Sequence, residues 1–137
     1  MNRFADACHE VGTRPCGVTV LTSKTQKVCL NEFGAPPKRK VTEYMEILLD
    51  AGFTDAVCSP EEVRAIRQHA KFNGIDLHTP GVRLAGGDTQ DQARVATPAT
   101  VLADGGTTMV VGRPLTNGVP SKNWKVWMDV INAARAA

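Results

Sequence analysis

Several features that mark particular classes of protein are scarce or missing in this sequence. Only 5% of its 137 residues are aromatic, and the formal net charge is +2. So mild a charge does not favour nucleic acid or an acidic membrane surface as a partner. No apolar run approaches the roughly 20 residues needed to cross a membrane, and the polar start MNRFADACHE is unlike a secretory signal. We therefore expect a cytoplasmic protein that has neither nucleic acid nor a membrane among its partners.

Cysteine and histidine are present, but neither is grouped in the way that a metal site or a disulfide framework requires. The cysteines are Cys8, Cys16, Cys29 and Cys58, and the histidines are His9, His69 and His78. No two cysteines have zinc-ligand spacing, and no histidine pair lies near them. We predict reduced thiols, no metal and no cofactor. His78 adjoins a glycine-rich loop, but a structural role is favoured for it.

Short apolar runs alternate with longer amphipathic segments along the chain. The runs CGVTVLTS, DAVCSP, IDLHTPG and TMVVGRP each end in Thr, Ser, Gly or Pro and predict strands within 16–23, 55–60, 75–81 and 108–114. Strands that alternate with helices indicate right-handed βαβ units and a parallel sheet. The length and the 42% apolar content fit one domain that spans residues 1–137.

The amphipathic segments predict helices within 3–12, 41–52, 59–74, 97–106 and 121–137. The clearest start is SPEE, where Ser59 is the N-cap, Pro60 takes the first helical position and Glu62 completes a capping box. In segment 41–52 we expect a buried face of Tyr44, Ile47, Leu48 and Ala51. In segment 121–137 we expect a core stripe of Trp124, Trp127, Met128 and Ile131. Residues 24–40 predict a short helix and an irregular connection, with KRK as a solvated turn.

The loop TPGVRLAGGDTQDQARVATP, residues 79–98, cannot build a core and follows a predicted strand. In parallel α/β folds, ligands bind at the carboxyl ends of the strands. Glycines let a backbone approach an anion closely, and arginine offers a planar fork that matches phosphate. Arg83 in this loop, and Gly112 with Arg113 after the next strand, therefore predict a phosphate cup, with Gln92 in reach of a hydroxyl or carbonyl. The alternative is a flexible surface turn at Gly86-Gly87, with Arg113 paired to a carboxylate.

The motifs VTVLTS, VCSPEE, TPGVR, DQARVATP and VVGRPLT occur in this order between residues 18 and 116. Together they closely resemble the second half of bacterial-type orotidine 5′-monophosphate decarboxylases. That family converts orotidine monophosphate (OMP) to uridine monophosphate (UMP) and CO2 without cofactor or metal, on a (β/α)8 barrel that usually dimerises. The resemblance implies an α/β fold that is half of a TIM-type barrel, with about four βα units.

The resemblance also implies roles for particular residues. Thr22 would lie against the pyrimidine, and Arg83 and Arg113 with the backbone at Gly112 would hold the phosphate. Gln92 would bridge towards phosphate and base. The ligand would be a nucleoside monophosphate, OMP or UMP, or another phosphate compound.

The departure from the family is the absence of its Asp-x-Lys-x-x-Asp motif. Proton delivery to the ring carbon and stabilisation of developing charge need such groups, so we assign no catalytic residue, and Lys24 and Lys27 are not substitutes.

The chain begins about where the helix after the family's fourth strand would begin, which predicts that strands five to eight are present. A half-barrel leaves open sheet edges and an uncovered face, so a homodimer or a complementary half-barrel chain is expected. Three readings stay open: half of a decarboxylase, inactive alone; a non-catalytic phosphate-binding half-barrel; or a truncated remnant.

Overall fold

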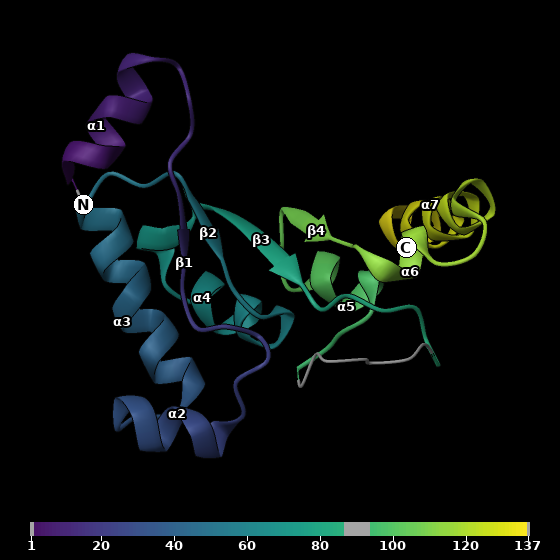
Figure 1. The fold of residues 1–137 in the computed structure, drawn as a ribbon, viewed down its shortest axis with the longest axis horizontal. Coiled ribbons are helices and arrows are strands. Elements are labelled where there is room, and N and C mark those ends of the chain that lie inside the picture. The colour runs from purple at the N-terminus through teal and green to yellow at the C-terminus, as the bar shows by residue number, and fades with distance from the viewer. Residues whose placement is uncertain (1, 87–93, 137) are drawn as a thin grey trace.

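The computed structural model describes residues 2–86 and 94–136, and its centre is a four-stranded parallel sheet (Figure 1). Each strand pairs with the next one along the chain, which confirms the predicted parallel α/β arrangement. The strands are β1 (Cys16–Val18), β2 (Asp55–Val57), β3 (Asp76–Pro80) and β4 (Thr108–Val110). They are shorter than the apolar runs predicted, because each run continues past its last paired residue into the turn that follows.

Seven α-helices and two single 3₁₀ turns are described around the sheet. The helices are α1 (Asn2–Glu10), α2 (Gln26–Phe33), α3 (Pro37–Asp50), α4 (Val63–Arg67), α5 (Pro98–Ala103), α6 (Arg113–Thr116) and α7 (Pro120–Ala136). The 3₁₀ turns are η1 (Pro60–Glu62) and η2 (Ala70–Phe72). The predicted helix at 59–74 is thus divided into η1, α4 and η2, and the extended backbone of His69 (φ −100°, ψ 102°) separates η2 from α4.

The connection at residues 24–40 is more regular than predicted. Helix α3 begins at Pro37, so the KRK run forms its first turn and is not an irregular connection. Proline suits this position because its fixed φ matches the helix and it has no N–H to leave unpaired. Lys38 and Arg39 are exposed, as a solvated segment would be.

The larger hydrophobic cluster lies between the sheet and the helices on one of its faces. Ala56 and Leu77 point into it from β2 and β3, and both are fully buried. Gly17 faces the same way, and a Cβ there would lie 2.2 Å from Leu48 Cδ2 of α3. The predicted buried face of α3 was partly wrong. Its buried residues are Pro37, Val41, Met45 and Leu48, and Ile47 is 44% exposed, so the stripe that packs on the sheet includes Val41 and Met45 and not Ile47.

A smaller cluster lies beside β4, where α7 packs against α5 and α6 (Figure 1). Its buried members are Val82, Val101 and Trp127. The predicted stripe on α7 is correct for Trp127 but wrong for Trp124, which is 58% exposed. This helix therefore buries a narrower face than the sequence predicts.

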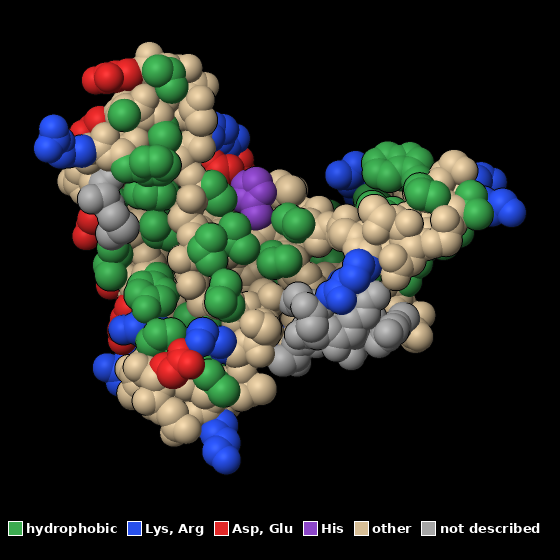
Figure 2. Space-filling view, viewed as in Figure 1, with side chains coloured by type: hydrophobic (Ala, Val, Ile, Leu, Met, Phe, Trp, Pro, Cys, Tyr) green, Lys and Arg blue, Asp and Glu red, His purple; other side chains and the backbone are tan. Residues whose placement is uncertain are grey.

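The opposite face of the sheet carries a row of side chains that no described helix covers. The parallel register aligns Val18, Val57, His78 and Thr108 across the four strands. Val18 is 59% exposed, and Figure 2 shows hydrophobic side chains gathered beside a histidine on this face. We call this surface the open face. No helix among the described residues is long and apolar enough to cross a bilayer.

Candidate functional site

The carboxyl ends of the strands collect the segments that carry most of the predicted binding residues. Thr22 follows β1, Arg83 follows β3, and Gly112 with Arg113 follows β4. Because the four strands are parallel and in sequential order, these segments leave the same edge of the sheet, which we call the binding edge. β3 and β4 are neighbours, whereas β1 and β4 are three strand spacings, roughly 14 Å, apart.

The segment after β3 is held by backbone pairing. Val82 and Ala96 form a parallel bridge, and the Arg83 N–H donates to the Ala96 carbonyl at 2.9 Å. Gly81 adopts φ 86°, a conformation that other residues rarely reach, so the turn out of β3 depends on glycine here. The Arg83 side chain is only 8% exposed, and its Nη1 donates to the Val82 carbonyl at 2.8 Å. Arg83 therefore lies within the edge and does not extend from it.

The segment after β4 turns at once into a short helix. Gly112 is the N-cap residue of α6, and its carbonyl accepts from the Leu115 N–H at 2.8 Å. Arg113 takes the first helical position and is exposed, so its guanidinium is accessible from solution. A short helix, α6, thus follows β4 almost directly. Of the remaining predicted residues, Gln92 and Gly87 lie outside the described residues.

A buried ion pair crosses the binding edge, and the sequence alone did not reveal it. Arg94 contacts Glu62 through Nη1 and donates through Nη2 to the Leu21 carbonyl at 3.0 Å. The Arg94 and Glu62 side chains are 9% and 1% exposed. The predicted capping box is confirmed, since Glu62 Oε2 accepts from the Ser59 N–H at 2.9 Å. Nothing local in the sequence around Arg94 indicates its partner, which lies 32 residues earlier.

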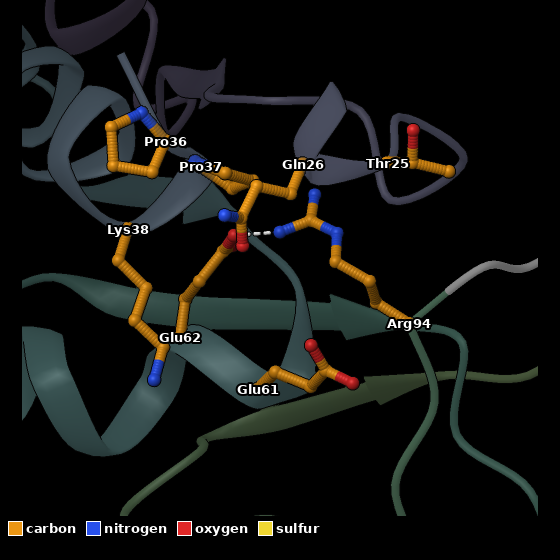
Figure 3. A pocket seen from close by; sticks show the side chains of 8 residues that line it. All are labelled: Thr25, Gln26, Pro36, Pro37, Lys38, Glu61, Glu62 and Arg94. Atoms are coloured by element: carbon orange, nitrogen blue, oxygen red, sulfur yellow. Dashed lines mark hydrogen bonds and ion pairs between the residues drawn. The ribbon is translucent and has the colours of Figure 1, made fainter. Parts of the chain in front are cut away.

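The pair lies beside a cavity of about 450 Å³ (Figure 3). The cavity is lined by Thr25, Gln26, Pro36, Pro37, Lys38, Glu61, Glu62 and Arg94. Burial lowers the pKa of Arg94, and burial also raises the pKa of the nearby Cys58 thiol to about 12. Cys58 is therefore a protonated thiol at neutral pH and not a nucleophile.

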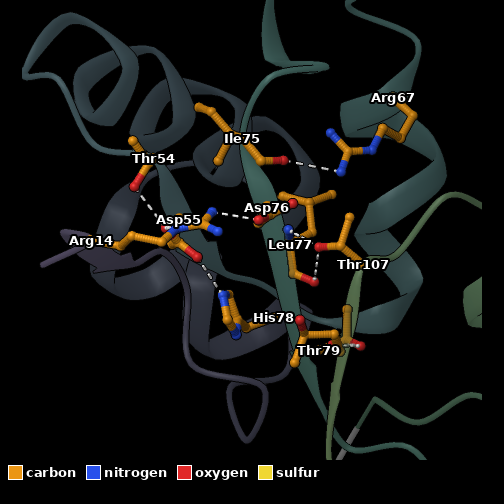
Figure 4. Close-up of polar contacts among 11 residues, drawn as sticks. Arg14, Thr54, Asp55, Arg67, Ile75, Asp76, Leu77, His78, Thr79 and Thr107 are labelled. Atoms are coloured by element: carbon orange, nitrogen blue, oxygen red, sulfur yellow. Dashed lines mark hydrogen bonds and ion pairs between the residues drawn. The ribbon is translucent and has the colours of Figure 1, made fainter. Parts of the chain in front are cut away.

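At the opposite, amino-terminal edge of the sheet, a polar network ties the starts of β2 and β3 together (Figure 4). Asp55 accepts from Arg14 Nε at 2.8 Å and from the Thr54 hydroxyl at 2.7 Å, and it contacts His78 Nε2 at 2.7 Å. Arg14 also pairs with Asp76. Burial alone would raise the pKa of Asp55, but the bonds from His78, Thr54 and Arg14 outweigh it and lower that pKa. His78 thus has a structural partner.

The described residues offer little for metal or covalent chemistry. No three His, Cys, Asp or Glu side chains group into a possible metal site within 2–86 and 94–136. Lys24, the first lysine after β1, pairs with Glu32 of α2. The four cysteines are all free thiols.

Comparison with known proteins agrees with this arrangement. The model of the Orotidine 5'-phosphate decarboxylase / HUMPS family matches residues 1–123. Orotidine 5'-phosphate decarboxylase of Frankia casuarinae is 46% identical over 105 residues, which are 75% of this chain and 37% of that protein. The same enzyme of Heliobacterium modesticaldum is 41% identical over 107 residues, 77% of this chain and 43% of that protein.

A solved structure likewise matches this chain over only part of its own length. The crystal structure of orotidine 5'-phosphate decarboxylase from Lactobacillus acidophilus superposes with a TM-score of 0.68 at 26% identity, covering 88% of this chain and 50% of that one. The chain therefore spans about half the length, or less, of the relatives that it matches. Four parallel strands with flanking helices, aligned to half of a TIM-barrel protein, confirm the predicted half-barrel fold.

Proposed function

Because the chain belongs to the Orotidine 5'-phosphate decarboxylase / HUMPS family, we propose that it binds a nucleoside monophosphate, OMP or UMP, of pyrimidine biosynthesis. The observation that carries the proposal is the pairing of β3 with β4. Arg83 and Arg113 each follow one of these neighbouring parallel strands, Arg83 buried within the edge and Arg113 exposed on it. Charge-assisted bonds from arginine are the interactions that phosphate recognition uses.

Each predicted residue has a role in this proposal. The accessible Arg113 and the backbone at Gly112 grip the phosphate, and Arg83 supports them from within the edge. Thr22, at the end of the sheet away from β4, lies against the pyrimidine, so the nucleotide runs along the edge. Gln92, outside the described residues, bridges phosphate and base.

Decarboxylation would need groups that these residues do not supply. The 137 residues contain no Asp-x-Lys-x-x-Asp sequence, and we propose that the lysine and carboxylates come from a complementary half-barrel. The open face supports this, because Val18 and Val110 on it are 59% and 47% exposed, whereas inward-facing residues of a complete barrel pack in layers. A second copy of this chain is the other occupant that this surface would accept. Residues 1–137 act as one domain in either assembly, in the cytoplasm.

The missing motif also favours a second candidate, a half-barrel that binds phosphate compounds and catalyses nothing. The two differ in turnover. A decarboxylase half should convert OMP when it is mixed with an N-terminal half of a family member that carries the motif. A pure binding module should still bind UMP in that mixture without producing any from OMP.

The phosphate assignment is tested by calorimetric titration of UMP, with uridine and inorganic phosphate as separate ligands. Arg113→Ala should weaken UMP binding by about 1.5–3 kcal/mol, which is roughly 10- to 100-fold in Kd. Arg135→Ala is the matched control, since Arg135 is exposed and lies with Thr107 and Thr108 by the start of β4. Equal affinity of wild type and Arg113→Ala would show that the phosphate lies elsewhere. If the wild type does not bind UMP at millimolar concentration, the proposal is wrong for the isolated chain.

A further inference from the structure

We propose that Arg94 is a positioning residue that holds three strand-end segments of the binding edge in one arrangement. Its guanidinium joins Glu62, in the turn after β2, to the carbonyl of Leu21, in the segment after β1. Arg94 itself lies in the segment that returns to β3. One side chain therefore connects the ends of β1, β2 and β3.

The groups around Arg94 adjoin the residues that the proposed function uses. Leu21 directly precedes Thr22, and the Leu21 carbonyl also accepts from the Lys24 N–H at 3.0 Å, which closes the turn around Thr22. Two residues after Arg94, the Ala96 carbonyl accepts from the Arg83 N–H at 2.9 Å. A shift of the Arg94 guanidinium would thus be transmitted to the proposed pyrimidine end and to the proposed phosphate end.

Glu62 fixes the position of this connection. One carboxylate oxygen caps the turn after β2 by accepting from the Ser59 N–H, and the other receives Arg94. Both carboxylate oxygens of Glu62 thus have a partner, and Glu62 is 1% exposed. It cannot follow Arg94 to another place without uncapping η1, so the turn after β2 acts as the fixed point.

Stability alone does not explain the ion pair between Arg94 and Glu62. The Nε of Arg94 is buried and makes no hydrogen bond within the described residues. A buried donor without a partner is costly, and buried ion pairs often stabilise less than apolar residues of similar size. A geometric role explains why an arginine is used here: its planar guanidinium presents Nη1 to the carboxylate and Nη2 to the carbonyl in a fixed geometry, whereas lysine is a point charge without that fork.

The chain contains a matched control at the opposite edge. Arg67 also joins separate segments through one guanidinium, donating to the carbonyls of Gly105, Phe72 and Ile75 at 2.8–3.0 Å. Gly105 precedes β4 and Ile75 precedes β3, so Arg67 ties together the amino-terminal ends of strands. Loss of Arg67 should destabilise the chain without disturbing the binding edge.

The test compares wild type, Arg94→Met, Arg94→Lys and Arg67→Met by amide hydrogen exchange in the free protein, with UMP titration beside it. We expect exchange at the Lys24 and Arg83 amides to be at least about tenfold faster in both Arg94 variants. Arg67→Met should leave exchange at these two amides within about twofold of wild type, even if it lowers the Tm by as much as the Arg94 variants do. UMP affinity should fall at least about tenfold in the Arg94 variants and not in Arg67→Met, because displaced contacts lose binding energy.

A double variant, Glu62→Met with Arg94→Met, leaves no unpaired buried charge and serves if Arg94→Met does not fold. It should fold and still show the fast exchange at Lys24 and Arg83. Unchanged exchange in either folded variant, or equal acceleration in Arg67→Met, would overturn the positioning role. The consequence for UMP rests on the proposed function, but the exchange measurement needs no ligand. If wild type fails to bind UMP, the proposed function falls while the exchange still decides the role of Arg94.

Discussion

The two hydrophobic clusters of this chain differ in how completely they are enclosed. The cluster under β1, β2 and β3 is bounded by α3 and α4 and includes the fully buried Met45, Phe72 and Leu77. The cluster beside β4 has three buried residues among those described, and its main helix, α7, leaves Trp124 58% exposed. Figure 1 shows this second region extending away from the first at the β4 end of the sheet.

The two regions therefore differ in how much of their apolar surface they bury within this chain. The first region has helices over one face of its strands and a core of many fully buried side chains. The second region ends at β4, which pairs on one side only among the described residues, and its helix α7 leaves Trp124 exposed. Unpaired edges and apolar patches are the surfaces on which further chains pack.

The largest expected effect comes from removing equal side chains from the two clusters. Met45→Ala, in the first cluster, should lower the free energy of unfolding by about 2–5 kcal/mol, because it leaves a cavity in an enclosed core. Met109→Ala removes the same atoms from β4, where Met109 is only partly buried, and should cost about 1 kcal/mol. Urea denaturation of both variants measures the difference. Equal losses would mean that the second cluster is as well enclosed as the first.

The sequence predicted the first region better than the second, for a physical reason. The short apolar runs predicted four parallel strands, and all four lie in one parallel sheet. The stripe on α7 failed at Trp124 because amphipathic spacing shows which face is apolar, but not whether anything packs on it. The start of α3 was missed because two prolines and three cations conceal a helix that tertiary packing stabilises.

At the binding edge, motifs placed Thr22, Arg83, Gly112 and Arg113 after the correct strands. The sequence could not predict that Arg83 is buried while Arg113 is exposed, because that depends on the bridge between Val82 and Ala96. It also missed the pairing of Arg94 with Glu62, since a contact across 32 residues leaves no local pattern. The roles of Thr22, Arg83, Gln92, Gly112 and Arg113 in binding stay predictions.

A medium effect should come from the polar network that closes the first region at its amino-terminal edge. Asp55→Asn removes a nearly buried carboxylate that accepts from Arg14 and Thr54 and contacts His78. It should cost about 1.5–3 kcal/mol, the range for bonds to a charged group. Asp76→Asn is the control, because Asp76 shares Arg14 but its side chain is 39% exposed, and a surface pair is worth at most about 1 kcal/mol.

The pH dependence follows from the lowered pKa of Asp55. A carboxylate whose pKa is lowered on folding stabilises the protein above its unfolded pKa of about 3.9, and the contribution is lost as pH falls through the folded value. Thermal unfolding between neutral pH and pH 3 should therefore show wild type losing stability below about pH 4. Asp55→Asn should lose less over the same interval. Parallel curves for the two proteins would show that Asp55 is not the group that titrates.

The smallest effect on stability is expected from Trp124→Gln. This variant also tests most directly whether another chain packs on the second region. Trp124 is largely in water, so its loss should change the free energy of unfolding of the monomer by no more than about 0.5 kcal/mol. If the second region is incomplete because another chain packs on α7, the same change should weaken self-association measured by sedimentation equilibrium, since exposed aromatic side chains dominate interface energies. Lys122→Gln, also exposed on α7, removes no apolar surface and should leave association unchanged. A monomer at every concentration in both variants and wild type would leave a complementary half-barrel, rather than a second copy, as the partner for this surface.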